Sequence, residues 1–253
     1  MTVSDRITAL ETSVARLRAI VEPLDAAQLA RPAYPSEWTL ADALSHLGSG
    51  ATIMKQNIEA HLAGTETPAD FNQGVWDLWN AKAPEDQAAD SLAADQALFD
   101  RIASLADEQR AAFSLPLGPM TLDFDSALAL RLSEHALHTW DVEVGLDPSA
   151  TIPGDVAAHV IDKLDIVLRF GAKPDGVVRS LAVETTDPQA DLVLATSADE
   201  ASLGAGQPTG APDLLIPTEA LIRLVYGRLD PDHVPAGVDE AVIAGLRPVF
   251  PGI

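Results

Sequence analysis

The sequence predicts an α+β protein of two domains: an N-terminal four-helix bundle and a small C-terminal α+β domain. The length of 253 residues is enough for two compact units of about 100–150 residues each. Apolar residues recur at helical spacing in four long segments before residue 145, and shorter helical and β-like patterns alternate after it. A hydrophobic content of 47% and a charged content of 21% allow a sizeable core to form.

Spacing and capping residues predict the first two helices. In the first, Ser4 or Asp5 can cap the start. Its apolar residues follow one another in alternating steps of three and four: Ile7, Leu10, Val14, Leu17, Val21 and Leu24. The second helix begins at Thr39, because Asp42 three residues later gives an approximate capping box, and it continues toward Gly64.

Two further helices complete the predicted bundle. After a polar loop that carries Trp76 and Trp79, the third helix is expected at residues 85–113. The fourth helix is expected at residues 124–144 and ends at Gly145. The four tryptophans of the chain are expected mainly in the core, although the two in the loop could line the mouth of a pocket. Four long helices with mostly short connections are typical of a four-helix bundle.

The pattern changes between Gly145 and Gly154, a stretch rich in proline and glycine. We therefore place the domain boundary after residue 148, which gives domains 1–148 and 149–253. The second domain is expected to begin with a helix at residues 155–170 and to end with a helix at Thr218–Leu229. Between them we expect the loop Gly204–Pro212 and the β-like runs Val177–Thr185, Leu192–Thr196 and Leu214–Ile216.

Composition excludes several functions. The formal net charge of −22 argues against binding to nucleic acid or to an anionic membrane surface, because it repels phosphate. The absence of cysteine excludes disulfides, thiolate nucleophiles and cysteine-bound zinc, so any thiol chemistry needs a thiol cosubstrate. No signal-peptide pattern and no run of roughly 18 or more apolar residues is visible, so we expect a cytoplasmic protein. The oligomeric state stays open.

One pair of residues suggests a metal site. Glu134 and His138 share a face of a predicted helix that is apolar on nearly every side, and buried charges need partners. A metal ion is one such partner, and a carboxylate–imidazole contact without metal is the alternative. A third ligand must come from another helix, for which His46 is the natural donor. Two histidines and a glutamate form a catalytic zinc set, although Ni²⁺, Mn²⁺ or Fe²⁺ would also fit. Asp42 is expected to cap its helix rather than to bind metal.

These residues also carry a resemblance. The segment Trp38–Leu47, the distant Glu134-x-x-x-His138 pattern and the following Thr139–Val142 look like the DinB-like metalloprotein bundle. More narrowly, they are similar to the mycothiol-dependent maleylpyruvate isomerase family. Members of that family join a DinB-like bundle to a small α+β domain resembling sterol carrier proteins, and Pro217–Leu229 is similar to part of that domain.

The resemblance implies a function and its residues. It implies metal ligation by His46, Glu134 and His138, with zinc favoured, and makes Arg228 the functional arginine. The activity implied is that of a transferase or isomerase that uses mycothiol as a small-molecule thiol and acts on a small electrophilic or anionic substrate. Arg228 would pair with an anionic group. Alternatively, its positive charge interacts favourably with the C-terminal dipole of its own helix. The alternative function is a non-catalytic, metal-containing protein that binds a small or apolar ligand.

Overall fold

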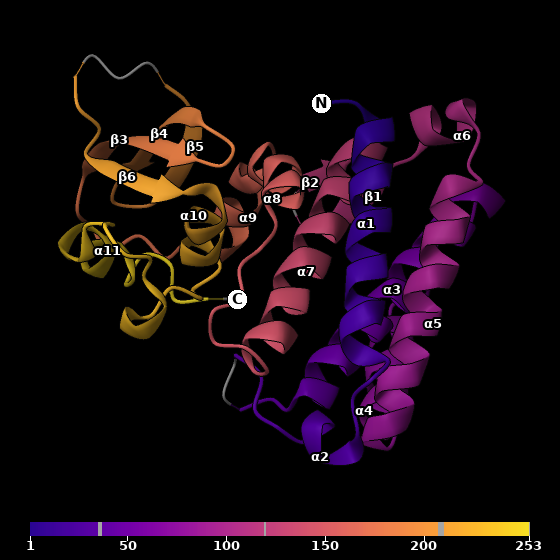
Figure 1. Ribbon diagram of the computed structural model, residues 1–253. Helices are drawn as coiled ribbons and strands as arrows, with labels where there is room; N and C mark the ends of the chain where they lie inside the picture. The colour runs from indigo at the N-terminus through magenta and orange to yellow at the C-terminus, as the bar shows by residue number, and fades with distance from the viewer. Residues whose placement is uncertain (35–36, 119, 207–209, 253) are drawn as a thin grey trace. The chain divides into compact units, whose positions relative to one another are not determined.

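The computed structural model of the chain describes residues 1–34, 37–118, 120–206 and 210–252. These residues divide into two units, Met1–Ala150 and Thr151–Ile253 (Figure 1). The first unit is mostly helical, whereas the second combines helices with a sheet. This mixed architecture in two parts agrees with the predicted fold class. No helix in the described ranges combines the length and the apolar character needed to span a membrane.

Four long helices pack side by side in the first unit. They are α1 (Val3–Val21), α3 (Leu40–Ala63), α5 (Pro84–Ala103) and α7 (Phe124–Val144). Both α1 and α3 contact α5 and α7, so the four helices surround a common core (Figure 1). Leu17, Leu44 and Leu47 are among its fully buried residues. The helical spacing in the sequence predicts these four helices, although it extends the third one too far.

Local sequence fixes the ends of the helices. The Thr2 and Asp5 side chains each accept a hydrogen bond from the other's backbone N–H, a capping box that starts α1 two residues earlier than a serine cap would. Thr39 and Asp42 form the same box at the start of α3, so Asp42 is a capping residue as predicted. Gly64 ends α3 with a φ of 65°, which favours glycine.

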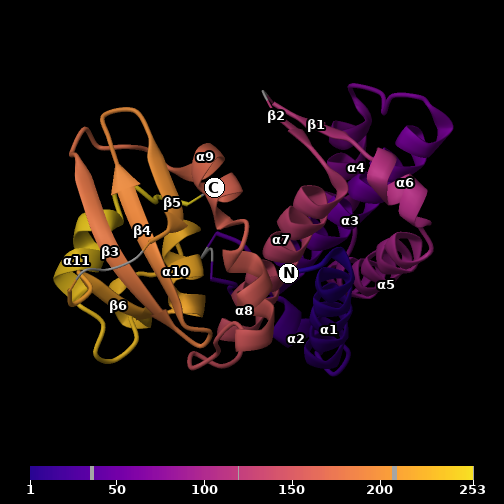
Figure 2. The ribbon, with the colours of Figure 1, turned by 90° about the horizontal axis from the view of Figure 1, so that it is seen from above.

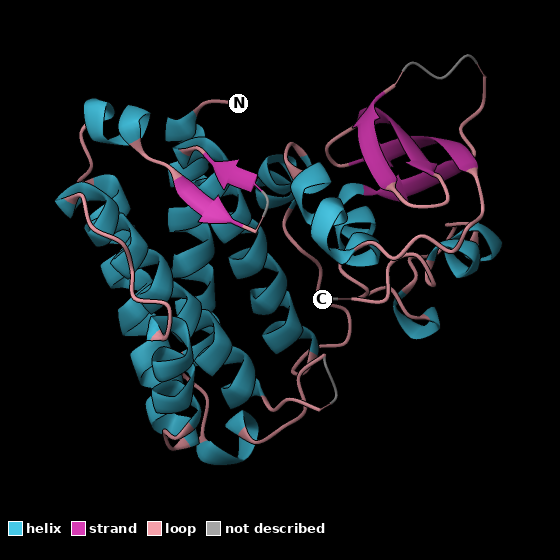
Figure 3. Ribbon diagram, turned by 180° about the vertical axis from the view of Figure 1, so that it is seen from behind, coloured by secondary structure: helices cyan, strands magenta, loops and turns pink. Residues whose placement is uncertain are grey.

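Shorter elements complete the first unit, and most of them depart from the sequence prediction. They are α2 (Ala26–Leu29), α4 (Phe71–Asn80), α6 (Asp107–Ala112), β1 (Leu115–Leu117) and β2 (Met120–Leu122). The strands β1 and β2 form an antiparallel hairpin (Figure 3), which the sequence did not indicate. The expected polar loop is wrong, because α4 forms there and buries Val75 and Trp79. The expected helix 85–113 is also wrong, since the chain leaves α5 at Ser104 to bury Leu105 before α6 begins.

A four-stranded sheet organises the second unit. Its strands are β3 (Arg179–Thr186), β4 (Ala190–Thr196), β5 (Ala201–Ala205) and β6 (Leu214–Pro217), in the order β5-β4-β3-β6 (Figure 2). β6 runs parallel to β3, and the other neighbours are antiparallel. The helices are α8 (Gly154–Ile161), α9 (Leu164–Gly171), α10 (Thr218–Val225) and α11 (Glu240–Leu246), with a 3₁₀ turn at Pro231–His233. α9 packs against β5, and α10 packs against β3 and β6.

The second unit departs from the sequence prediction in several places. The expected helix 155–170 is two helices, α8 and α9, joined at Lys163, whose backbone N–H donates to the Val160 carbonyl. β5 is an unpredicted strand that overlaps the start of the expected loop Gly204–Pro212, of which residues 207–209 lie outside the described residues. The last predicted helix ends at Val225 rather than at Leu229. α11 was missed because seven residues are too few to reveal a helical period.

Candidate metal centre

Two neighbouring helices bring His46, Glu134 and His138 together. α3 supplies His46, and α7 supplies the other two residues, which share a face because they are one turn apart. Oε2 of Glu134 lies 3.6 Å from Nε2 of His46 and 3.6 Å from Nε2 of His138. One potential ligand atom from each of the three residues lies within 4.8 Å of the others. The three residues singled out in the sequence therefore form one cluster.

The separations suit a small metal ion. Zinc bonds to histidine nitrogen and carboxylate oxygen measure about 2.0–2.2 Å, so ligand atoms at tetrahedral angles lie roughly 3.3–3.5 Å apart. The two separations of 3.6 Å are close to that value. The side chains of His46 and Glu134 are 42% and 32% exposed, so another molecule can approach the cluster. The donor set therefore fits a metal ion with an open coordination position.

A buried carboxylate orients His138. Oδ2 of Asp141 lies 2.8 Å from Nδ1 of His138, and the Asp141 side chain is fully buried. A hydrogen bond at Nδ1 fixes the ring and leaves Nε2, the atom nearer to Glu134, for a metal. The backbone of Asp141 is held as well, because its carbonyl accepts from the N–H of Tyr34. Our sequence reasoning missed Asp141, although its position three residues after His138 on one helix was a usable signal.

Charges at the cluster set the protonation of its members. Burial would raise the pKa of Glu134, but hydrogen bonding and charge attraction from His138 and His46 hold that pKa well below its ordinary value. Burial lowers the pKa of His46, and the charges of His138 and Arg131 add to this effect against the attraction of Glu134. For His138, hydrogen bonds with Asp141 and Glu134 outweigh burial and raise the pKa. The lowered pKa values of Glu134 and His46 favour the forms that bind a metal ion, whereas the raised pKa of His138 makes a proton a stronger competitor for that ring.

Trp38 and a pocket border the cluster. The ring centroid of Trp38 lies 5.4 Å from that of His46 and 6.0 Å from that of His138. Trp38, which packs against the core as expected, thus also lies beside two of the candidate ligands. Beside His46 lies a pocket of about 420 Å³, lined by Glu37, Trp38, Asp42, His46, Ser49, Trp76 and Asn80. Trp76, which is 43% exposed, lines this pocket as considered from the sequence, whereas Trp79 is buried.

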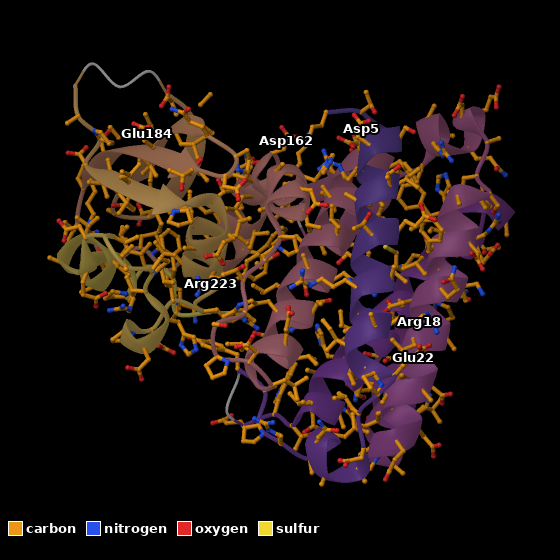
Figure 4. The ribbon with its side chains drawn as sticks, in the orientation of Figure 1. Asp5, Arg18, Glu22, Asp162, Glu184 and Arg223 are labelled. Atoms are coloured by element: carbon orange, nitrogen blue, oxygen red, sulfur yellow. The ribbon has the colours of Figure 1, made fainter. Side chains whose placement is uncertain are left out.

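Arg228, the other predicted site residue, belongs to the second unit. It follows α10 and is buried, and its Nη1 donates to the carbonyl oxygen of Tyr226 at 2.7 Å. Tyr226 is the C-cap residue directly after α10, so this contact agrees with the helix-end role. A role toward an anion stays a prediction. Within α10, Arg223 (labelled in Figure 4) is also buried and forms a two-pronged ion pair with Glu219.

Comparison with known proteins gives a family and a fold. Residues 10–143, just over half of the chain, match the family model described as "Mycothiol maleylpyruvate isomerase N-terminal domain". Two solved structures are similar in fold: a mycothiol-dependent maleylpyruvate isomerase, with a TM-score of 0.65, and a histidine-to-alanine mutant of such an isomerase, with 0.64. Each is 14% identical to this chain, and each match covers 90% of both chains. No curated protein matches the sequence significantly.

Proposed function

The chain belongs to the mycothiol maleylpyruvate isomerase family, and from that premise we propose that it is an enzyme that depends on a divalent metal ion and on mycothiol. His46, Glu134 and His138 would hold the metal, with zinc favoured, and the substrate would be a small electrophile. The convergence of three ligand atoms within 4.8 Å carries this proposal. A bound metal ion would lower the pKa of an incoming thiol or polarise a carbonyl oxygen.

The surrounding residues would hold the ligands in place and cover part of the site. Asp141 fixes the ring of His138 through Nδ1. Trp38 lies against both histidine rings and would limit the access of water to the faces that it contacts. Because the chain has no cysteine, the reacting sulfur would come from mycothiol.

Two reactions agree with this arrangement. In a cis–trans isomerisation, the thiolate adds to a carbon–carbon double bond, the resulting single bond rotates, and the thiolate leaves again as the double bond re-forms. In a transfer reaction, the sulfur stays on the electrophile. The family match favours either reaction over a non-catalytic binding protein.

The charges around the pocket indicate which groups it would accept. Glu37 and Asp42 line the pocket, and its described lining includes no lysine or arginine. A substrate carboxylate would meet like charges there, at a cost of about 1 kcal/mol per pair 4 Å apart in water and more in less polar surroundings. A neutral polar group that stacks on Trp38 or Trp76 would fit better. We propose that the guanidinium of Arg228 binds an anionic group, because it offers two parallel hydrogen-bond donors to a carboxylate.

Metal content and thiol consumption test the proposal. Elemental analysis of the purified chain should give one metal ion per chain, and His138→Ala should lose it. The matched control is His61→Ala, which changes a histidine of α3 outside the cluster and should keep the metal. Mycothiol consumption in the presence of an electrophile should require the metal. Wild-type metal content in His138→Ala would overturn the ligand assignment, and a metal-loaded chain that never consumes thiol would favour the binding protein.

A further inference from the structure

Five buried polar side chains form a network that connects three of the long helices of the first unit. Ser13 comes from α1, Asp95 from α5, and Arg131, His135 and Thr139 from α7. Nη2 of Arg131 donates to Oδ1 of Asp95, and Nε2 of His135 lies 3.3 Å from Oδ2 of the same carboxylate. Nδ1 of His135 lies 2.8 Å from Oγ of Ser13 and 3.4 Å from Oγ1 of Thr139. We call these five residues the buried network.

The buried network reaches the backbone next to the candidate metal ligands. Nη2 of Arg131 also donates to the carbonyl oxygen of Leu47, at 3.2 Å, and Leu47 directly follows His46 on α3. Arg131 itself lies three residues before Glu134 on α7. Gly50 provides the space, because a Cβ atom there would lie 3.1 Å from Nη1 of Arg131. One guanidinium therefore joins the two helices at the level where each presents a ligand.

Stability alone does not account for this arrangement. Within the described residues, Nε of Arg131 is buried and forms no hydrogen bond, and Oδ2 of Asp95 and Nε2 of His135 face each other at 3.3 Å without the geometry of a hydrogen bond. Buried polar atoms without hydrogen bonds cost free energy of folding. Replacing a buried ion pair by apolar side chains of similar volume is often neutral or stabilising. An ion pair that is dispensable for stability can still select one relative position of two helices.

We propose that Arg131 and Asp95 are positioning residues that set the separation between His46 on α3 and Glu134 and His138 on α7. Asp95 holds the guanidinium from α5, and the guanidinium holds the α3 backbone at Leu47. The ligand atoms are thereby brought together before a metal ion binds. This inference rests on the proposed function for its metal, but the geometry that it predicts belongs to the metal-free chain.

The double variant Asp95→Leu/Arg131→Met tests the inference, because it removes both charges together. We expect its metal-free form to melt at or above the wild-type temperature, and its Zn²⁺ dissociation constant, from competition with a chromophoric chelator, to rise about 10- to 100-fold. In a crystal structure of the metal-free variant, Nε2 of His46 should lie farther from Oε2 of Glu134 than the 3.6 Å seen here. Unchanged affinity together with an unchanged separation would overturn the inference.

Two more variants keep the test decisive. Arg6→Met/Asp125→Asn is the matched control. It removes a different interhelical ion pair, between α1 and α7, in which the arginine is also buried, and it should leave Zn²⁺ affinity unchanged. If the double variant does not fold, Arg131→Lys keeps the positive charge but is too short to place its ammonium where Nη2 contacts both Asp95 and the Leu47 carbonyl, so Zn²⁺ binding should still weaken several-fold. Wild-type affinity in Arg131→Lys would then overturn the inference. If the wild-type chain binds no Zn²⁺, the proposed function fails, and the ligand separations in the metal-free crystals alone decide the inference.

Discussion

His138 and Asp141 are joined through Nδ1 and Oδ2, 2.8 Å apart, on the same buried stretch of α7. One helix therefore carries both a candidate metal ligand and the carboxylate that orients it. The hydrogen bond selects the ring nitrogen that is left for a metal, since Nδ1 is already engaged. Asp141 is fully buried, so solvent does not compete for this contact.

Removal of the Asp141 carboxylate should weaken metal binding strongly and change the stability of the metal-free fold only a little. In Asp141→Ala the His138 ring loses the partner at Nδ1, and Zn²⁺ affinity should fall about 10- to 100-fold. In Asp141→Asn the Zn²⁺ affinity should fall less, because the amide oxygen of the asparagine can still accept a hydrogen bond from Nδ1–H of His138. Chelator competition gives the affinities, and melting of the metal-free variants reports any general damage. Equal affinities in the wild type and Asp141→Ala would show that the ring is held by other contacts.

The candidate ligands could be predicted because long helices with strong spacing carry them. Glu134 and His138 follow from the period of α7, and Thr39 and Asp42 fix the start of the helix that carries His46. Each inference needed only local sequence. The pairing of His46 with these two residues rested on the family resemblance, because local sequence does not show which faces of two helices meet.

The elements that the sequence did not reveal depend on contacts distant along the chain. α4 forms around Gly74 and buries Val75 and Trp79 against the bundle. Their spacing of four residues was a usable helical signal, but Gly74 weakens the helical preference of the segment. β5, with the sequence Ala-Ser-Leu-Gly-Ala, has little strand preference and is formed by pairing with β4. Trp38 packs against the core as expected, but its contacts with both histidines were not predicted, because they require the turn before α3 to meet α7.

Gly48 should be intolerant of even a methyl group. A Cβ atom there would lie 2.2 Å from a ring carbon of Trp79 and 2.9 Å from Cα of Ser91. Gly48→Ala should therefore lower the free energy of unfolding by about 1–3 kcal/mol, as overpacking does in a tight core. The matched control is Gly74→Ala on α4, where a Cβ meets nothing within 4 Å and stability should stay equal or rise by up to about 1 kcal/mol. Urea denaturation of both variants makes the comparison, and equal losses would contradict it.

Asp95 should make stability depend on pH in the acid range. Burial raises the pKa of Asp95, but the charges of His135 and Arg131, together with the hydrogen bond from Arg131, outweigh burial and lower it overall. A carboxyl group whose pKa is lower in the folded state stabilises the fold above its unfolded-state pKa of about 3.9, and this contribution is lost as pH falls through the folded-state value. Asp95→Asn lacks the contribution at every pH. The stability difference between wild type and Asp95→Asn should thus be largest near neutral pH and should shrink below about pH 4. Urea denaturation across this range measures it, and a constant difference would exclude the charge as its cause.

Arg228 is the residue at which two physical roles predict different measurements. If it only satisfies the Tyr226 carbonyl at the end of α10, Arg228→Lys should keep most of the stability, and the loss should stay within about 1 kcal/mol. If it also binds an anionic group of the substrate or thiol, Arg228→Lys should lower kcat/KM nearly as much as Arg228→Ala does, because an ammonium cannot replace the two parallel donors of a guanidinium.

Loss of such a contact from the transition state costs about 2–4 kcal/mol, which corresponds to a roughly 30- to 1000-fold lower rate. The measurement is kcat/KM beside the melting temperature for wild type, Arg228→Lys and Arg228→Ala. A large fall in kcat/KM in both variants with a small change in melting temperature would show that Arg228 binds the anionic group. Normal kcat/KM in Arg228→Ala with a lower melting temperature assigns it to the helix end, and the anionic group must then pair with another residue.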